Sequence, residues 1–460
     1  MKKVLAMILA STMCVSLAAC GGSSSSADSG STAETPAPAT AEEAPAEEAP
    51  AEAEPTADGV EITLWTYPIG SWGGTEPTAE AMIDVFEAQY PDITVKVQYL
   101  DYASGDDQVM SAMTGGTTPD VIMEGPERLV SNWGAAGKMV DLSDLWTAEV
   151  TADIEAVSPN VVEACQSPDG AFYEYPLCMT VHTMAINYEV FEAADALQFM
   201  DVENRTWTTD GFFSAIEAVK NAGQVITPGI VYCGGQGGDQ GTRALVNNLY
   251  SGTYTNATFT EYTANSAENV RALEALNTAV AAGHLTADAS FAAAEELQAF
   301  ANQTAAMSFC WNASNAASYA SQVTFTPYAM AFPTDNGTPE LCGGIWGFGI
   351  FDNGDAAKIE AAKTFLQFMA DDATQGPDSV RATGFFPVRA SQGDVYVGTD
   401  KAENMEPYVQ LMPYLGSYYN VIGNWTAQRT GWFNLLQQVF SGEDVQGAAD
   451  TFVAEANAGI

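Results

Sequence analysis

Hydrophobic positions recur with two different periods over the first part of the chain. Residues 62–65 form a short apolar run and residues 93–100 alternate between apolar and polar side chains, which predicts two strands. Apolar residues spaced three and four apart predict helices over 77–89 and 106–113, and another apolar run follows at 121–123. This strand–helix–strand–helix–strand order predicts parallel strands connected by crossover helices.

The same two periods continue to the end of the chain. Short apolar runs predict strands at 229–232 and 304–310. Helical periodicity predicts helices over 189–194, 207–222, 266–282, 291–302 and 356–369, with two more near the C-terminus. We find no internal repeat, so the second part of the chain is predicted to build elements of its own rather than a copy of the first.

The N-terminus has the pattern of a targeting signal. Lys2 and Lys3 precede an apolar core at 4–17 that is too short to span a membrane. Leu17-Ala18-Ala19-Cys20 matches a lipobox, which predicts a lipoprotein signal peptide over 1–19 and acylation of Cys20. An ordinary secretory signal with a chance cysteine is the alternative.

Residues 20–59 are predicted to be a disordered acidic tether. Residues 21–59 contain nine acidic and no basic residues, and no aromatic or branched aliphatic side chain that could form a core. The whole chain of 460 residues has a net charge of −44, which excludes nucleic acid as a partner because phosphate backbones require basic surfaces. The five cysteines after Cys20 lack short CxxC spacing, so free thiols are expected, and a Cys310–Cys342 pair stays open.

Several short motifs occur in a fixed order along the chain. Gly116-Thr-Thr-Pro-Asp-Val121 is followed by Gly137-Lys-Met-Val-Asp-Leu142, by Asp169-Gly-Ala-Phe-Tyr-Glu-Tyr-Pro176 and by Ile186-Asn-Tyr-Glu-Val-Phe191. Ala305-Ala-Met-Ser-Phe-Cys-Trp311 comes later. Their order resembles the carbohydrate-binding, maltose-binding-protein-like family of extracellular solute-binding proteins of bacterial ABC importers, and the resemblance covers most of residues 60–460.

The resemblance implies an α/β fold of two lobes, each a mostly parallel sheet flanked by helices. The lobes would be joined by a hinge of two or three crossings, near 177–186, 329–345 and 384–388. Lobe 1 would comprise 60–180 and 336–385, and lobe 2 would comprise 181–335 and 386–460.

Catalytic chemistry is not indicated by the sequence. The chain has only two histidines and contains neither an HExxH nor a GxSxG motif. Carboxylate pairs suited to glycoside hydrolysis carry no information among 59 acidic residues, because chance alone produces them. The glycine-rich segment 234–243 lacks the Gly-Lys-Ser/Thr ending of a phosphate-binding loop, so it is either a cleft-lining loop or a plain turn. We predict no enzyme, no cofactor and no metal site.

Ligand-binding candidates come from two kinds of residue. Aromatic side chains in or next to loops suit the apolar faces of sugars, although each has an alternative role in packing. These are Trp65, Tyr67, Trp72, Tyr102, Trp311, Trp346, Phe386 and Trp425. Polar candidates for contacts with hydroxyl groups are Asp101, Asp107, Glu124, His182, Asp239, Arg243 and Asn312. Trp311 is singled out as a stacking platform, because Asn312 and other polar residues follow it.

The predicted function is capture of a sugar or oligosaccharide between two lobes and its delivery to a membrane permease. The protein would be a monomer held by the lipid on Cys20 at the extracellular face of the cytoplasmic membrane. Three alternatives stay open: a binding protein for a small anionic solute such as a glycerol phosphate, a surface-anchored glycan-active enzyme, and an adhesin or sensor without a transport role.

Overall fold

The computed structural model describes residues 59–72, 78–102, 104–235, 237–417 and 421–460. The predicted signal peptide, Cys20 and all of the tether except Gly59 lie outside the described residues, as does Pro77 at the start of the predicted 77–89 helix. No helix in the described ranges has the length and apolar character needed to cross a membrane.

A six-stranded sheet with strand order β13-β4-β12-β3-β1-β2 organises the first part of the described chain. Strand β1 (Val60–Thr66) pairs in parallel with β2 (Ile93–Tyr99) and with β3 (Val121–Glu124). Helices α1 (Thr78–Gln89) and α2 (Gly105–Gly115) connect these strands, so the predicted alternation of strands and helices is confirmed.

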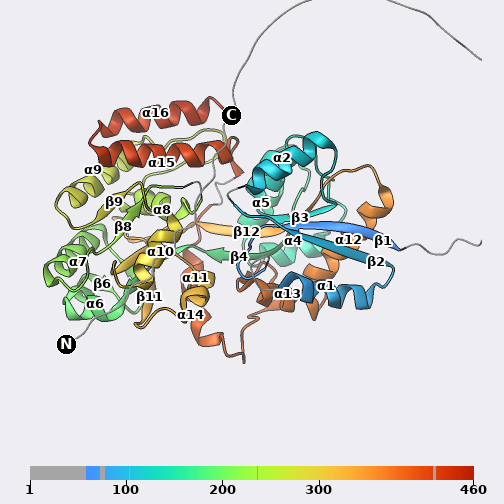
Figure 1. The fold of residues 1–460 in the computed structure, drawn as a ribbon, viewed down its shortest axis with the longest axis horizontal. Coiled ribbons are helices and arrows are strands. Elements are labelled where there is room, and N and C mark those ends of the chain that lie inside the picture. Colours follow the sequence, from blue (N-terminus) through green and yellow to red (C-terminus); the bar gives the residue numbers. More distant parts are fainter. Residues whose placement is uncertain (1–58, 73–77, 103, 236, 418–420) are drawn as a thin grey trace, which may run out of the picture. The chain divides into compact units, whose positions relative to one another are not determined.

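Helices pack on this sheet and bury its apolar side chains. On α1 the ring of Phe86 packs edge-on against Phe365 of α12 (Ala356–Asp371), with ring centroids 5.1 Å apart. In Figure 1, α1, α12 and α13 lie beside the blue strands β1 and β2. The other helices of this part are α3 (Pro126–Arg128), the π-helix η1 (Leu129–Gly134), α4 (Ala148–Glu155), α5 (Pro159–Cys165) and α13 (Gln375–Thr383).

The chain leaves the six-stranded sheet at His182. Strand β4 (Tyr175–Val181) belongs to that sheet, whereas β5 (Thr183–Asn187) is the central strand of a three-stranded sheet. The chain returns between β11 (Pro327–Met330) and β12 (Gly343–Ile350), and β4 and β12 lie side by side at the centre of Figure 1. After the short strand β13 (Phe386–Pro387) it runs to α14 (Ala402–Leu411), which packs near β11.

The expectation of mostly parallel sheets holds for β1–β3 and for β8 with β9, but not for the crossing strands. Strand β12 is antiparallel to both β3 and β4, and β5 is antiparallel to β10 and β11. The reason is topological: β4 carries the chain out of the six-stranded sheet and β12 brings it back, so the two must run in opposite directions.

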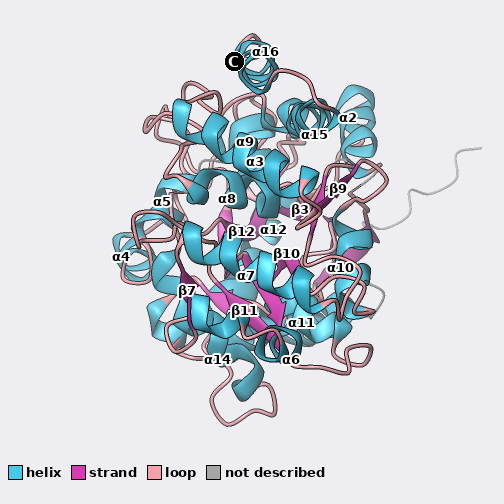
Figure 2. Ribbon diagram, turned by 90° about the vertical axis from the view of Figure 1, so that its left-hand side faces the viewer, coloured by secondary structure: helices cyan, strands magenta, loops and turns pink. Residues whose placement is uncertain are grey.

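The second part of the described chain has several small sheets surrounded by helices. They are a three-stranded sheet of order β10-β5-β11 and the pairs β6-β7 and β8-β9. Figure 2 shows these strands in magenta among the cyan helices. The strands are β6 (Met200–Asp201), β7 (Thr206–Trp207), β8 (Ile230–Tyr232), β9 (Thr286–Asp288) and β10 (Met307–Trp311). The helices are α6 (Tyr188–Ala193), η2 (Ala196–Phe199), α7 (Thr209–Ala222), α8 (Gln240–Leu249), α9 (Ala267–Ala281), α10 (Ala293–Ala301), α11 (Ala313–Tyr319), η4 (Met412–Tyr414), α15 (Trp425–Ser441) and α16 (Val445–Asn457). The 3-10 helix η3 (Ala390–Gln392) packs instead against α4 of the first part, where Ser391 donates to Asp153.

The predicted elements recur in the structure with shifts of a few residues at their ends. The segment 177–186, which the resemblance implied to be a crossing, is divided between two sheets. The five cysteines of the described part are free thiols, so Cys310 and Cys342 do not form a disulfide in this structure.

Candidate functional site

A first group of polar and aromatic side chains lies where β1, β2 and β3 end, and we call it the Arg128 group. In a parallel sheet the carboxyl ends of neighbouring strands meet at one edge, which is where ligands bind in α/β folds. The members of the Arg128 group are Tyr67, Tyr102, Asp106, Glu124 and Arg128. Arg128 ends the short helix α3, which begins two residues after β3.

Arg128 is held by two carboxylates. Its Nε and Nη2 atoms donate to the two carboxylate oxygens of Asp106, at 2.7 and 3.0 Å, and its Nη1 atom donates to Oε1 of Glu124 at 2.8 Å. Only 3% of the Arg128 side chain is exposed. This two-pronged geometry fixes the plane of the guanidinium group.

Two tyrosine rings complete the Arg128 group. The rings of Tyr67 and Tyr102 stack with centroids 5.1 Å apart and an interplanar angle of 23°. The guanidinium carbon of Arg128 lies 5.1 Å from the Tyr67 centroid and 5.8 Å from the Tyr102 centroid. Tyr67 is fully buried and its hydroxyl donates to Asp106 at 2.6 Å, whereas Tyr102 is 42% exposed. The outer ring of the stack therefore faces open space.

The carboxylates of this group differ in their acidity. Burial raises the pKa of Glu124 to about 8; the charge of Arg128 opposes the rise, and nearby Glu127 and Asp106 add to it. Burial acts in the same direction on Asp106, but its hydrogen bonds with Arg128 and the Arg128 charge outweigh burial, so its pKa is lowered. Near neutral pH, Glu124 can therefore hold a proton while Asp106 is ionised.

A second group, the Arg243 group, surrounds the start of α8. Its members are Asp239, Arg243, Tyr254, Trp425 and Arg429. The carboxylate of Asp239 lies between two guanidinium groups, with its oxygens 2.7 Å from Nε of Arg243 and 2.9 Å from Nε of Arg429. Burial alone would raise the pKa of Asp239, but the charges of Arg243 and Arg429 outweigh it and lower the pKa.

Aromatic rings enclose Arg243. Its guanidinium carbon lies 4.3 Å from the ring centroid of Trp425 and 5.0 Å from that of Tyr254. The hydroxyl of Tyr254 donates to the side chain of Gln428 on α15. The N-terminal end of α8, which carries Arg243, is thereby connected to helix α15.

The two groups act on each other electrostatically. Arg429 belongs to α15, yet its charge contributes to the lowered pKa of Asp106 and opposes the rise of the Glu124 pKa in the first group. His182, at the crossing, completes the arrangement. Burial, followed by the charge of Arg243, lowers the pKa of His182 to about 4, so its imidazole is neutral at physiological pH. Its Nε2 atom is buried and has no hydrogen-bond partner among the described residues.

Seven of the fifteen predicted binding residues meet in these two groups and at the crossing between them. They are Tyr67, Tyr102, Glu124, His182, Asp239, Arg243 and Trp425. The glycine-rich segment that leads into Asp239 borders the Arg243 group. A Cβ atom added at Gly237 would lie 3.3 Å from Nη2 of Arg429.

The predicted aromatic residues outside these groups contact other neighbours. Trp72 is fully buried against Phe348, and the half-buried ring of Trp346 stacks on Phe385 at 4.8 Å. Phe386 packs against Tyr396.

The predicted polar residues outside the groups have local roles. Asp101 accepts hydrogen bonds from the backbone and the hydroxyl of Ser104. The exposed Asp107 lines a shallow recess together with Trp65. The binding roles of these residues stay predictions.

Trp311 lies in a different setting from the one expected. It is the last residue of β10, is 1% exposed and packs edge-on against Phe300, with centroids 5.2 Å apart. Asn312 uses its side chain to cap α11, accepting from the backbone of Asn315 at 2.8 Å. The polar neighbours that suggested a binding loop thus serve a helix N-terminus, and stacking of Trp311 on a ligand stays a prediction that its burial does not favour.

Sequence reasoning missed four members of the groups: Asp106, Arg128, Tyr254 and Arg429. Arg128 had a usable signal, because it follows the third predicted strand by a few residues and bases are scarce in this chain. Arg429 lies one helical turn after Trp425, which was predicted. No signal in the sequence indicated that α15 lies near α2 and α3.

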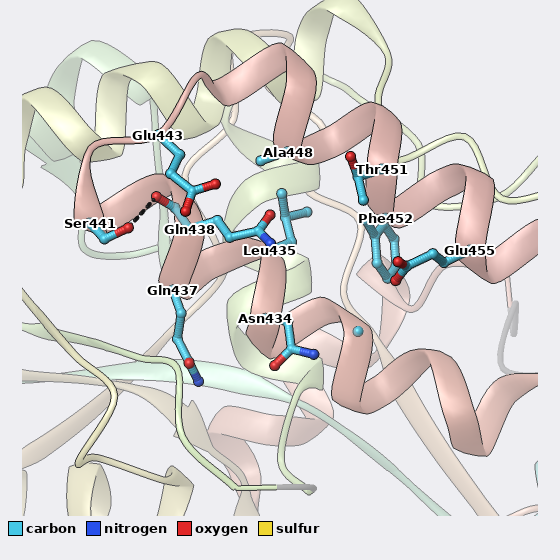
Figure 3. Close-up of a pocket in the computed structure, with 11 residues that line it drawn as sticks. Asn434, Leu435, Gln437, Gln438, Ser441, Glu443, Ala448, Thr451, Phe452 and Glu455 are labelled. Atoms are coloured by element: carbon cyan, nitrogen blue, oxygen red, sulfur yellow. Dashed lines mark hydrogen bonds between the residues drawn. The ribbon is translucent and has the colours of Figure 1, made fainter.

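The described part also contains recesses away from the two groups. One of about 480 Å³ lies between α15 and α16. Figure 3 shows its lining, which includes Asn434 and the carboxylates of Glu443 and Glu455. None of the predicted binding residues lines it.

Comparison with known proteins identifies relatives of this chain. The family model described as bacterial extracellular solute-binding protein matches residues 72–376. No curated protein matches the sequence significantly. An ABC substrate-binding protein from Listeria monocytogenes, solved in complex with cycloalternan, superposes with a TM-score of 0.68 at 19% identity over 87% of this chain and 99% of that one.

Two further solved structures superpose to a similar extent. The GacH receptor of Streptomyces glaucescens, studied without ligand and with acarbose, gives a TM-score of 0.68 at 16% identity, covering 86% of this chain and 97% of that one. The sugar-binding protein MalE from Xanthomonas citri gives 0.67 at 15% identity, covering 87% and 98%. At these identities the likeness shows the fold, which is the expected α/β fold of the two-lobe binding proteins.

Proposed function

This chain belongs to the family of bacterial extracellular solute-binding proteins, and we propose that it captures a neutral sugar or oligosaccharide where the Arg128 group and the Arg243 group face each other. The family consists of binding proteins rather than catalysts. The observations that carry the proposal are the two clusters of rings, carboxylates and guanidinium groups, together with the hydrogen bond that the Ser131 hydroxyl of η1 donates at 2.5 Å to the backbone carbonyl of Val421, just before α15. Elements from both parts of the fold thus contribute to one site.

The chemistry of the two groups suits a sugar. An exposed aromatic ring such as that of Tyr102 packs on the apolar C–H faces of pyranoses, and carboxylate and guanidinium groups bond hydroxyls in their plane. The similar proteins solved with cycloalternan and with acarbose bind compounds of this class. Their identity to this chain is too low to transfer the ligand itself.

The ion pairs favour a neutral ligand over an anionic one. Arg128 is engaged by Asp106 and Glu124, and the carboxylate of Asp239 lies between Arg243 and Arg429. A phosphate would have to compete with these carboxylates for the guanidinium groups. The glycerol phosphate alternative is therefore the weaker of the two.

We propose that the ligand closes two lobes by bending at the crossings, of which His182 is one. A few residues at element ends absorb such rotations in hinge proteins. Small-angle scattering with and without a saturating ligand tests this: the radius of gyration should fall on binding, and an unchanged profile would contradict a hinge.

We also propose that the protein is a monomeric lipoprotein, held by acylated Cys20 on a flexible tether, that passes its ligand to an ABC permease. The lipobox and the acidic low-complexity segment support the anchor, and family membership supports the transport role.

Calorimetric titration with a panel of neutral oligosaccharides, such as maltose and maltotriose, tests the proposed site. Arg429→Gln should weaken binding of the best ligand about tenfold or more, because it removes a charged hydrogen-bonding group from a buried site. Arg271→Gln is the matched control, since Arg271 stacks on Tyr250 at 3.7 Å outside both groups. Equal affinities of the two variants would place the ligand elsewhere.

A further inference from the structure

A recess of about 380 Å³ lies beside the C-terminal end of α8, and none of the predicted binding residues lines it. Its walls are the end of α8, the loop 251–259 and the segment 334–342 that leads into β12. Its volume falls within the usual range of small-molecule sites, roughly 300–1,000 Å³. The loop and the segment lie far apart in sequence but are connected here, because Asn336 donates to the hydroxyl of Ser251 at 2.8 Å.

The lining of the recess is polar but mostly uncharged. Hydroxyl and carboxamide side chains predominate, accompanied by the rings of Tyr254 and Phe259. The charged side chain of the lining is that of Glu340, a carboxylate. Such a lining offers hydrogen bonds and apolar faces together, and it disfavours an anion.

Two neighbouring asparagines of α8 behave differently. The carboxamide of Asn248 is fully used: its Nδ2 atom donates to the carbonyls of Ala244 and Glu340, at 2.8 and 2.7 Å, and its Oδ1 atom accepts from the Glu340 backbone at 2.8 Å. Asn247 lines the recess as well, yet its buried Oδ1 atom has no hydrogen-bond partner among the described residues. A buried acceptor without a partner is costly, so its retention indicates a use.

The loop that carries Phe259 has an unusual backbone. Phe259 has a φ of 52° and Ser251 a φ of 58°, in the left-handed region that non-glycine residues seldom adopt. Asn256 holds the turn, because its carbonyl accepts from the backbone of Phe259 at 3.2 Å and its Oδ1 atom accepts from the backbone of Thr260 at 2.9 Å. Strain of this kind is concentrated at functional sites, and here it sets a half-buried ring at the recess.

We propose that this recess is a second binding site, for a neutral polyhydroxylated solute such as a sugar ring, with the Asn247 carboxamide as a hydrogen-bond partner and the Phe259 ring as an apolar face. The recess shares Tyr254 with the Arg243 group, but Asn247 and Phe259 belong to neither group, so the proposal does not depend on the function proposed for those groups. An occupant would contact both α8 and the segment entering β12, which connects the three-stranded sheet to the six-stranded sheet.

Side-chain amide resonances report on the site directly. In protein labelled with ¹⁵N at asparagine, the Asn247 amide is identified as the signal that disappears in Asn247→Ala. Addition of D-glucose or maltose up to about 100 mM should shift it along a saturating curve with a millimolar dissociation constant. The Asn434 amide, from the recess of Figure 3 and identified in Asn434→Ala, should not follow that curve.

Two comparisons define the chemistry of the occupant. D-glucose 6-phosphate should bind more weakly than D-glucose, because Glu340 lines the recess. Phe259→Leu keeps the apolar volume but removes the ring face, and should raise the dissociation constant about threefold or more. An unshifted Asn247 amide with both neutral sugars, or parallel shifts of Asn247 and Asn434, would overturn the proposal.

A stability measurement checks the premise independently. Asn247→Ala should leave the urea midpoint of unfolding unchanged or raise it, whereas Asn248→Ala should lower it, because only Asn248 uses its carboxamide in the folded protein. A lowered midpoint for Asn247→Ala would show that its side chain is already bonded, and the inference would fail. Neither result bears on high-affinity binding at the first site.

Discussion

Replacing Asp239 by asparagine tests how the Arg243 group is held together. The substitution keeps the shape of the side chain but removes the negative charge that lies between Arg243 and Arg429, at 2.7 and 2.9 Å. Both Asp239 and Arg243 have side chains that are fully buried. The change therefore leaves a guanidinium group in the interior without its compensating carboxylate.

The expected loss is large because the remaining charge cannot reach water. Breaking a buried ion pair by removing one partner costs about 3–5 kcal/mol of unfolding free energy. Arg429→Gln should cost less, about 1–3 kcal/mol, because the pair between Asp239 and Arg243 persists. The order of the two losses follows from the geometry, because Asp239 contacts both guanidinium groups.

Urea denaturation of the unliganded protein measures both losses as shifts of the midpoint, with m-values compared to detect changes in the transition. Asp144→Asn is the matched control: it breaks the bond of Asp144 with Lys363 at 2.6 Å, but 58% of the Asp144 side chain is exposed. An exposed pair of this kind contributes about 1 kcal/mol or less.

The acid dependence gives a second readout. The pKa of Asp239 is lowered in the folded state, so its contribution is present above its usual pKa of 3.8 and is lost as pH falls through the folded value. Asp239→Asn should therefore lose less stability on acidification than the parent protein. The reasoning is refuted if Asp239→Asn costs no more than Asp144→Asn, or if Arg429→Gln costs more than Asp239→Asn.

Three further predictions follow from burial and from the N-terminal motif. Trp311→Ala should lower the unfolding free energy of the unliganded protein by about 3–5 kcal/mol, because its ring is 1% exposed; weakened ligand binding with unchanged stability would instead restore the stacking role. Burial raises the pKa of Glu296 to about 8, so between pH 4.5 and 8 the folded state keeps a proton that the unfolded state has released. As pH rises through this window, the unfolding free energy should fall by up to about 1.4 kcal/mol per pH unit. In urea titrations at several pH values, Glu296→Gln should flatten the slope of unfolding free energy against pH by that amount. An unaltered slope would contradict the raised pKa of Glu296. Cys20→Ser should release the protein from the membrane into the medium, as immunoblots of cell fractions would show, and full retention would exclude the lipid anchor.

Local sequence patterns predicted most of the elements because they depend on neighbouring residues alone. The alternation over 93–100 gave β2 and the apolar spacing over 106–113 gave α2, since each pattern reflects one buried face of one element. The family was also accessible from the sequence, because the order of its short motifs is preserved. A crossing near 177–186 was implied by the resemblance, whereas the residue at which the chain changes sheet, His182, was not, because both sides of it are equally apolar.

The candidate site was predictable where aromatic side chains lie in or next to loops. Tyr67, Tyr102 and Trp425 were found in this way, since such rings suit the apolar faces of sugars. Arg128 and Arg429 were missed because their importance lies in the partners they meet, which are distant in sequence. The buried setting of Trp311 was not foreseen for the converse reason: polar neighbours in sequence do not show which way an indole ring points.

The sequence by itself determined the order of strands and helices, the family and the acidic N-terminal segment, because periodicity, motif order and composition are properties of the chain. Only the tertiary structure decided which charges meet. Asp106 pairs with Arg128 across 22 residues and Asp239 with Arg429 across 190, and sequence patterns do not encode contacts between elements so far apart. Burial, which raises the pKa of Glu124 and lowers that of His182, likewise exists only once those elements have packed together.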